Sequence, residues 1–122
     1  MAALVYLVDD LFFVARIRET AAALGLEAAS ARDPESAVAG SREAKLVILD
    51  LRRPDALRTL DLLTADPTSR PVRSLGFIDH ENVEGMEAAR RHGCGTVLSK
   101  RKFASDLPAL LASVAAGPDR LA

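Results

Sequence analysis

The sequence has few of the side chains that would assign it to a class by composition alone. Its 122 residues include one cysteine, no tryptophan and only 4% aromatic residues. The single cysteine, Cys94, cannot form an internal disulfide, which fits a protein of a reducing cytosol. No group of cysteines and histidines has the spacing of a zinc site. These absences speak against a disulfide-stapled secreted domain and a zinc-binding module, and we expect a cytoplasmic protein.

An excess of charge of one sign and long hydrophobic runs are also missing. Sixteen basic and seventeen acidic side chains leave a net charge of −1, so no overall field favours nucleic acid or an anionic membrane. The apolar run near the start is interrupted by Asp9 and Asp10 and follows no cationic segment, and no run is long enough to span a bilayer. We therefore expect no signal peptide, no membrane association and no nucleic-acid partner.

The sequence does contain a regular alternation of two patterns. Short apolar runs typical of buried strands cover residues 3–10, 26–30, 45–50, 71–77 and 95–100. Segments with apolar residues at helical spacing follow them, at 11–25, 33–43, 54–66, 81–93 and 103–117. Strict alternation predicts a parallel sheet with helices on both faces. Right-handed crossovers and a weak strand at 26–30 favour one α/β domain over residues 1–122, a doubly wound, flavodoxin-like sheet with strand order 2-1-3-4-5.

The helical segments carry three expectations about individual side chains. Of the adjacent Phe12 and Phe13, we expect one to pack inward and the other to be exposed. Val83 is expected to face inward from the fourth helix. Pro108 is expected within the first turn of the last helix, with Ser105 as its cap, because a missing N–H group is harmless there.

Carboxylates stand at the predicted ends of two neighbouring strands. In KLVILDLRRP (45–54), Asp50 ends a strand that is buried on both faces, and the strand next to it ends in Asp9 and Asp10. In open α/β sheets, ligands bind at this switch point between neighbouring strands. Carboxylates brought together repel one another, and Mg²⁺ is the hard cation that joins carboxylates to phosphate oxygens. Because Lys100 ends the fifth strand at the same edge, the sequence predicts the parts of a phosphoryl-transfer site: a metal, a carboxylate nucleophile and a fixed positive charge.

Four segments resemble a known family along essentially the whole chain. They are VDD (8–10), DLRRP (50–54), PVRSLGF (71–77) and GCGTVLSK (93–100). On these segments the chain resembles the receiver domain of response regulators, and its length is that of the single-domain chemotaxis (CheY-like) type.

This resemblance implies a role for each candidate site residue. Asp50 would accept a phosphoryl group from a histidine kinase or a phosphotransfer protein. Asp10 would be the principal Mg²⁺ ligand, with Asp50 and a supporting Asp9, and the backbone carbonyl of Arg52 would complete the protein ligands. Lys100 would contact the phosphoryl oxygens.

The sequence departs from the family pattern at four positions. Gly76 stands where receivers carry a threonine or serine that grips the phosphoryl group, and Val97 stands where they commonly carry an aromatic residue that turns inward on activation. The relay from the phosphoryl group to the partner-binding face is therefore expected to be absent. Phe77 replaces a small residue and is expected to narrow access to the site. Arg101 replaces the usual proline, so a cis peptide bond after the lysine is not expected.

Three functions remain open on these residues. The first is a stand-alone receiver that signals by contact through its fourth helix, fifth strand and fifth helix to an unnamed downstream protein. The second is a phosphorylation-independent pseudo-receiver, an interaction module or homodimer. The third is a Mg²⁺ phosphohydrolase, which Arg52 disfavours because such enzymes carry a second aspartate there. We expect no enzyme activity beyond self-phosphorylation and self-dephosphorylation, a solvated loop position for His80 and an unreactive thiol at Cys94.

Overall fold

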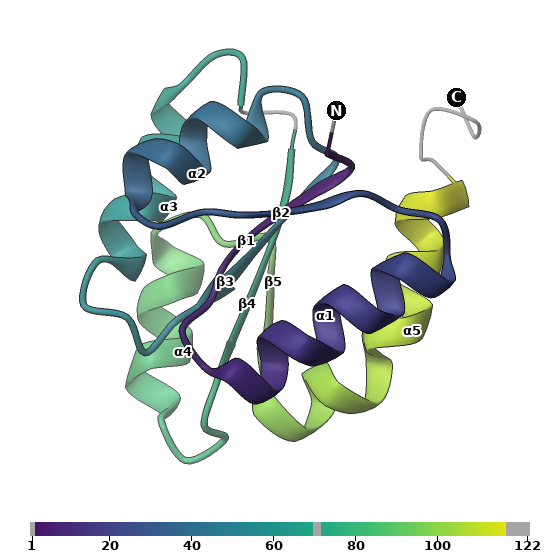
Figure 1. Cartoon of the computed structure of the whole chain (residues 1–122). Coiled ribbons are helices and arrows are strands. Elements are labelled where there is room, and N and C mark those ends of the chain that lie inside the picture. Colours follow the sequence, from purple (N-terminus) through teal and green to yellow (C-terminus); the bar gives the residue numbers. More distant parts are fainter. Residues whose placement is uncertain (1, 70–71, 117–122) are drawn as a thin grey trace.

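Strands and helices alternate along the chain as the sequence predicts (Figure 1). The structure is a computed structural model that describes residues 2–69 and 72–116. Its elements are β1 (Leu4–Leu7), α1 (Leu11–Ala23), β2 (Ala28–Ser30), α2 (Pro34–Ser41), β3 (Leu46–Asp50), α3 (Ala56–Ala65), β4 (Arg73–Ile78), α4 (Val83–Arg91), β5 (Thr96–Ser99) and α5 (Lys100–Ala116). The predicted strand start at residue 71, the predicted helix end at 117 and the ends of the predicted 1–122 domain lie outside the described residues.

The five strands form one parallel sheet in the order β2-β1-β3-β4-β5, which confirms the predicted doubly wound topology. The register sets Leu7 of β1 opposite Leu49 of β3, and Asp50 of β3 opposite Phe77 of β4. β1 and β3 therefore end side by side, and the residues that follow each of them emerge at one edge of the sheet. Among the described residues, no helix combines the length and apolar character needed to cross a membrane.

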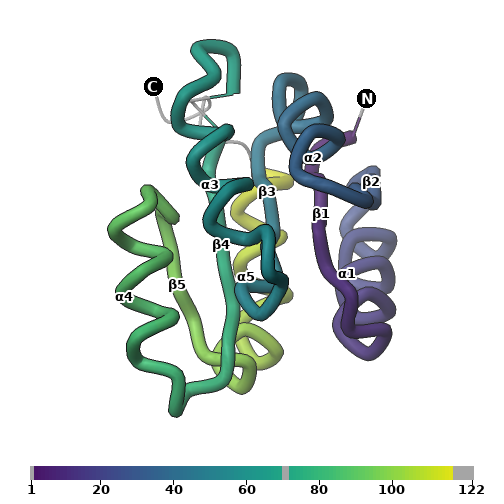
Figure 2. Tube along the Cα trace, turned by 90° about the vertical axis from the view of Figure 1, so that its left-hand side faces the viewer, coloured from purple at the N-terminus to yellow at the C-terminus, as the bar shows by residue number. Residues whose placement is uncertain are grey.

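Two hydrophobic cores flank the sheet. Since successive side chains of a strand point to opposite faces, Val47 and Ile48 belong to different cores. The helices α1 and α5 cover the face of Ile48, and α2, α3 and α4 cover the face of Val47 (Figure 1). Figure 2 looks onto the side of α2, α3 and α4, with α5 behind the sheet. Burial on both faces is the reason that the strand sequences are continuous apolar runs.

Phe77 lies in the core under α1 and α5. Its ring is fully buried and stacks on Phe103 with a centroid separation of 4.5 Å and an interplanar angle of 9°. The expectation that Phe77 narrows access to the site is therefore wrong, because the ring fills the interior between the sheet and the two helices. The chain has no cis peptide bond among its described residues, as expected from Arg101.

Two expectations about helix ends are also wrong. The helix α5 begins at Lys100, where Ser99 Oγ accepts the Lys102 N–H group at 3.1 Å, so Pro108 lies inside the helix. The carbonyl of Ala104, four residues before the proline, lacks its helical donor and instead accepts a hydrogen bond from Arg16 Nη2 of α1 at 3.3 Å. This tertiary contact supplies a donor to the carbonyl that the proline leaves without one.

The first residue of α4 shows the second error. Val83 is 57% exposed, whereas Ala89, further along the same helix, is buried. The prediction for α1 is confirmed: Phe13 is buried, and Phe12 beside it is 62% exposed.

Candidate functional site

A hollow of about 300 Å³ opens at the carboxyl edge of the sheet, where β1 and β3 end. It is lined by Asp9, Asp10, Asp50, Arg52, Arg53 and Pro54. The structure thus brings together the three aspartates that the sequence singles out and Arg52. It adds a residue that sequence reasoning missed, Arg53.

Asp50 is the last residue of β3 and is only 6% exposed. Its Oδ1 accepts the backbone N–H of Arg52 at 3.0 Å, and its backbone carbonyl accepts the N–H of Arg53 at 3.2 Å. The turn that follows the strand therefore fixes the orientation of the carboxylate. An anchored and nearly buried carboxylate at a strand end suits a nucleophile, because its approach to an incoming group is restricted to one direction.

Asp10 is the N-cap of α1. Its Oδ1 accepts the backbone N–H of Phe12 at 2.9 Å, which is the ordinary role of an aspartate before a helix. Asp10 thus has a structural function besides any role in binding. The next two side chains, Leu11 and Phe12, are strongly exposed.

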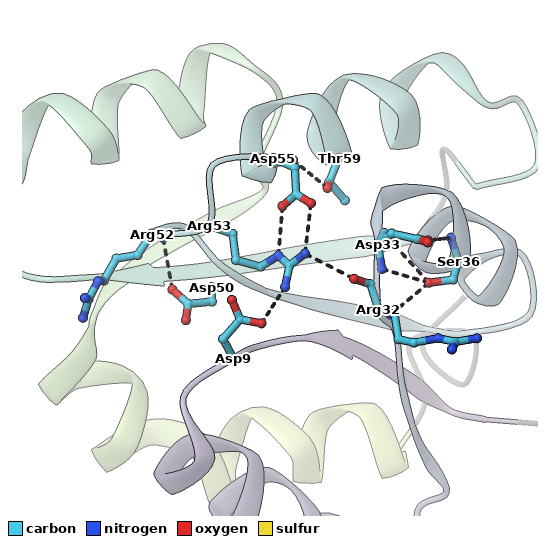
Figure 3. A network of polar contacts seen from close by, with 9 residues as sticks. All are labelled: Asp9, Arg32, Asp33, Ser36, Asp50, Arg52, Arg53, Asp55 and Thr59. Carbon is cyan, nitrogen blue, oxygen red and sulfur yellow. Dashed lines mark hydrogen bonds and ion pairs between the residues drawn. The ribbon is translucent and has the colours of Figure 1, made fainter.

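Asp9 is held by a guanidinium group. Its Oδ1 lies 2.5 Å from Arg53 Nη1 (Figure 3). The same guanidinium donates from Nε and Nη2 to the two carboxylate oxygens of Asp55, each at 2.9 Å, and from Nη2 to the backbone carbonyl of Arg32 at 3.3 Å. Arg53 therefore connects the end of β1, the start of α3 and the loop before α2.

The contacts of Arg53 shift the pKa values of the groups that make them. The Arg53 guanidinium holds the pKa of the Asp55 carboxyl below its usual range, chiefly through the forked hydrogen bonds, and the pKa of Arg53 is raised in return. Asp55 opens α3 without accepting any capping hydrogen bond on its side chain, so its carboxylate is directed to Arg53. The sequence signal that could have indicated this contact is the pair Arg53 and Asp55 in the turn after the acidic strand end.

The carboxylate oxygens that line the hollow are of a chemical type that suits a magnesium ion. The carboxylates of Asp10 and Asp50 are hard oxygen donors of the kind that Mg²⁺ prefers, and Arg52 lines the same hollow. Within residues 2–69 and 72–116, however, no three acidic, histidine or cysteine side chains are grouped as a metal site. Asp9, the supporting ligand expected from the sequence, already contacts Arg53.

Lys100 lies in a second hollow at the same edge. It is the first residue of α5, one position past the end of β5, and not the last residue of the strand as expected. Its Nζ lies 3.4 Å from Oδ1 of Asp79, which follows β4. This hollow, of about 390 Å³, is lined by Asp79, His80, Glu81, Ser99, Lys100 and Arg101. In the described part of the chain the ion pair of Lys100 is with Asp79, and no ion pair joins it to Asp50.

Gly76 and Val97 are opposite each other in the pairing of β4 with β5. A Cβ atom added to Gly76 would lie 2.7 Å from Cδ1 of Leu51, the residue directly after Asp50. The side chain of Leu51 therefore fills the space that a residue with a side chain at position 76 would need. Val97 is partly buried and packs against the same core.

Two further residues have the positions expected of them. His80 is exposed in the loop after β4. Cys94 is buried, burial raises the pKa of its thiol, and its Sγ donates to the carbonyl of Thr96 at 3.2 Å. A reactive cysteine needs an exposed site that favours the thiolate, so this thiol is a packing residue.

Comparisons with known proteins agree on the fold. No protein-family model matches the sequence, and no curated protein matches it. Among solved structures, the receiver domain of the sensor histidine kinase PA1611 from Pseudomonas aeruginosa PAO1, which has a magnesium ion coordinated in its active-site cleft, matches with a TM-score of 0.77. That match has 17% identity and covers 95% of this chain and 98% of that one.

Two other solved structures match in the same way. The chemotaxis protein CheY4 from Vibrio cholerae has a TM-score of 0.76 at 18% identity, covering 93% of this chain and 98% of its own. NtrX from Brucella abortus has a TM-score of 0.71 at 28% identity, covering 99% of this chain but 28% of the NtrX chain. The protein therefore has the CheY-like fold of response-regulator receiver domains.

Proposed function

We propose that the chain is a receiver domain of a two-component phosphorelay, spanning residues 1–122, that accepts a phosphoryl group on Asp50. The donor is a histidine kinase or a phosphotransfer protein. The observation that carries the proposal is the placement of Asp50: an anchored, nearly buried carboxylate at the switch point of a receiver fold, in one hollow with Asp9 and Asp10. In the transfer, an oxygen of Asp50 forms the new bond to phosphorus while the bond from phosphorus to the donor imidazole breaks. The electron pair of that bond stays on the imidazole nitrogen.

The remaining groups of the two hollows supply charge for this transfer. Asp10, Asp50 and the Arg52 carbonyl would hold Mg²⁺, which supplies positive charge to the phosphoryl oxygens when bound. Lys100 would reach the phosphoryl group by leaving Asp79. The side chains of that ion pair are 24% and 50% exposed and the two atoms lie 3.4 Å apart. Ion pairs near the surface contribute only about 0–1 kcal/mol, so the change of partner costs little free energy.

A second function is favoured by the contact between Leu51 and Gly76. Because no hydroxyl group stands at position 76 and Val97 has no ring to turn inward, phosphorylation has no evident relay to α4, β5 and α5. A pseudo-receiver would use that face, where Val83 is exposed, for a constitutive contact with a downstream protein or with a second copy.

Phosphorylation itself is tested by intact-protein mass spectrometry after incubation with a small phosphodonor and Mg²⁺. We expect one phosphoryl adduct on the wild type, none on Asp50→Asn, and an unchanged adduct on Asp61→Asn, which removes an exposed carboxylate of α3 outside the hollow. Absence of the adduct with every donor would eliminate the receiver function and leave the pseudo-receiver. An adduct that persists in Asp50→Asn would assign the phosphoryl group to another residue.

Beryllofluoride, which mimics a bound phosphoryl group, tests whether a change at Asp50 is transmitted to β5 and the helices beside it. We expect amide NMR signals around Asp50 to shift and those around Val97 to stay within the spread of distant residues. Large shifts along α4 and α5 would show that a relay exists without the hydroxyl and aromatic side chains.

A further inference from the structure

The guanidinium of Arg53 has a position that its neighbour Arg52 does not share. The Arg53 side chain is 14% exposed and donates to Asp9, to both oxygens of Asp55 and to the Arg32 carbonyl. The side chain of Arg52 points away from this network (Figure 3) and is exposed. The backbone of Arg53 is fixed as well, since its N–H donates to the carbonyl of Asp50 and its carbonyl accepts the N–H of Ala56. The positive charge is therefore held in place and does not sample the surface freely.

The contact of Arg53 with Asp9 is additional to its bidentate pair with Asp55. A bidentate arginine–carboxylate pair is complete with Nε and Nη2, which here engage Asp55. The remaining nitrogen, Nη1, reaches across to Asp9 at the end of β1, a residue 44 positions earlier in the chain. Asp9 is 67% exposed, so this contact is not required to compensate a buried carboxylate. What it does is place a positive charge inside the acidic hollow.

We infer that Arg53 is the resident cation of this hollow and that it competes with Mg²⁺ for Asp9, which makes the metal affinity of the protein low. The inference rests on the proposed Mg²⁺ site of the receiver function and adds a residue that sets its affinity. A metal that takes the Asp9 oxygen held by Arg53 must displace Nη1, and while the guanidinium stays in place it repels a divalent cation at close range.

The test compares Mg²⁺ affinities of matched variants by amide NMR titration, following the signals of residues 50–53. Arg53→Met keeps much of the length of the side chain and removes the charge. Arg58→Met is the control, because Arg58 is an exposed arginine of α3 that pairs with Glu35 outside the hollow. We expect Arg53→Met to bind Mg²⁺ about tenfold more tightly than the wild type, which corresponds to about 1.4 kcal/mol. The control is expected to stay within about twofold, as distant surface charges are screened.

An affinity of Arg53→Met equal to that of the wild type and the control would overturn the inference, while phosphorylation of Asp50 would remain a separate result. Conversely, tighter Mg²⁺ binding by Arg53→Met without any phosphoryl adduct would support the role of Arg53 and reject the receiver function. The two proposals therefore fail independently.

A second measurement uses the wild type alone and decides the question if Arg53→Met does not fold. The Nε–Hε signal of Arg53 in nitrogen-15 NMR reports its hydrogen bonds directly. We expect this signal to change with the same Mg²⁺ midpoint as the amides of residues 50–53, because the metal displaces the guanidinium from Asp9. Saturation of the amide shifts without that change overturns the inference.

Discussion

Replacing Gly76 by alanine tests whether Leu51 fills the place of the missing side chain. The backbone at Gly76 is not in the left-handed region, so alanine is compatible with it. Without any contact, alanine in a strand interior is expected to stabilise the fold by about 0.5–1 kcal/mol relative to glycine. The new Cβ, however, would lie 2.7 Å from Cδ1 and 2.8 Å from Cδ2 of Leu51, well inside van der Waals contact.

Crowding of this kind costs about 1–3 kcal/mol, and the end of a leucine side chain moves more easily than backbone. We therefore expect Gly76→Ala alone to lower the free energy of unfolding by about 1 kcal/mol. Leu51→Ala alone removes a half-buried leucine and is expected to lower it by about 1–2 kcal/mol. In the double variant the crowding is gone, so the second alanine should raise stability relative to Leu51→Ala.

The assay is a double-mutant cycle measured by urea denaturation of the four proteins. The contact predicts a coupling energy of about 1 kcal/mol or more, with Gly76→Ala changing from destabilising to stabilising when Leu51 is truncated. Additivity of the two substitutions within about 0.5 kcal/mol would refute the reasoning, because it would show that Leu51 moves aside without cost.

Three other substitutions test the contacts that the fold depends on. Asp55→Asn should lower the free energy of unfolding by about 1–2 kcal/mol at neutral pH, and the deficit should vanish as the pH falls. The sign follows because Arg53 lowers the pKa of Asp55 in the folded state. The stabilisation by Asp55 is therefore present above its unfolded-state pKa of about 3.9 and is lost as the pH falls below its folded-state pKa. A deficit that persists in acid would contradict this prediction. Pro108→Ala should raise the free energy of unfolding by about 1 kcal/mol in urea denaturation, because the new N–H can donate to the Ala104 carbonyl; an unchanged midpoint would show that the Arg16 contact already compensates in full. Phe103→Ala should lower stability by about 3–5 kcal/mol and abolish the near-ultraviolet signal of the aromatic cluster, since the ring is fully buried and stacked on Phe77; a loss below about 1 kcal/mol would mean that the core collapses around the gap.

The sheet topology was predictable because local pattern and global fold agree in this chain. Each apolar run is buried on both faces, as Val47 and Ile48 illustrate by joining different cores, and handed crossovers leave few ways to order the strands. The same rule places Asp50 at the edge where β1 ends, so the acidic side chains of the hollow could be found without coordinates.

The contacts within the site were not predictable, because they depend on side-chain choices among several charged neighbours. Arg53 selects Asp9 and Asp55 through the geometry of one turn, and Lys100 pairs with Asp79 although Asp50 also lies at this edge of the sheet. A pairing of Lys100 with Asp79 and a pairing with Asp50 are equally compatible with the charges in the sequence. Only the positions of the turn and of the first residue of α5 distinguish them.

The prediction of where α5 begins was wrong for a related reason. The sequence rule confines proline to the first turn of a helix, and that rule assumes that the freed carbonyl has no other donor. Here Arg16 of another helix supplies the donor to Ala104. A contact between residues 88 positions apart is invisible to any window of the sequence.

Two contacts of the site meet in the turn that follows Asp50. Leu51 occupies the space beside Gly76, and Arg53 connects Asp9 to Asp55 at the start of α3. Both contacts tie the surroundings of the Asp50 carboxylate to this turn instead of to β5. A phosphoryl group on Asp50 would add negative charge next to Arg53 and so change its balance between the two aspartates. If Asp50 is phosphorylated, the first response is therefore expected in residues 51–55 and at the N-terminus of α3, and NMR shifts confined to β5 and α4 would contradict this argument.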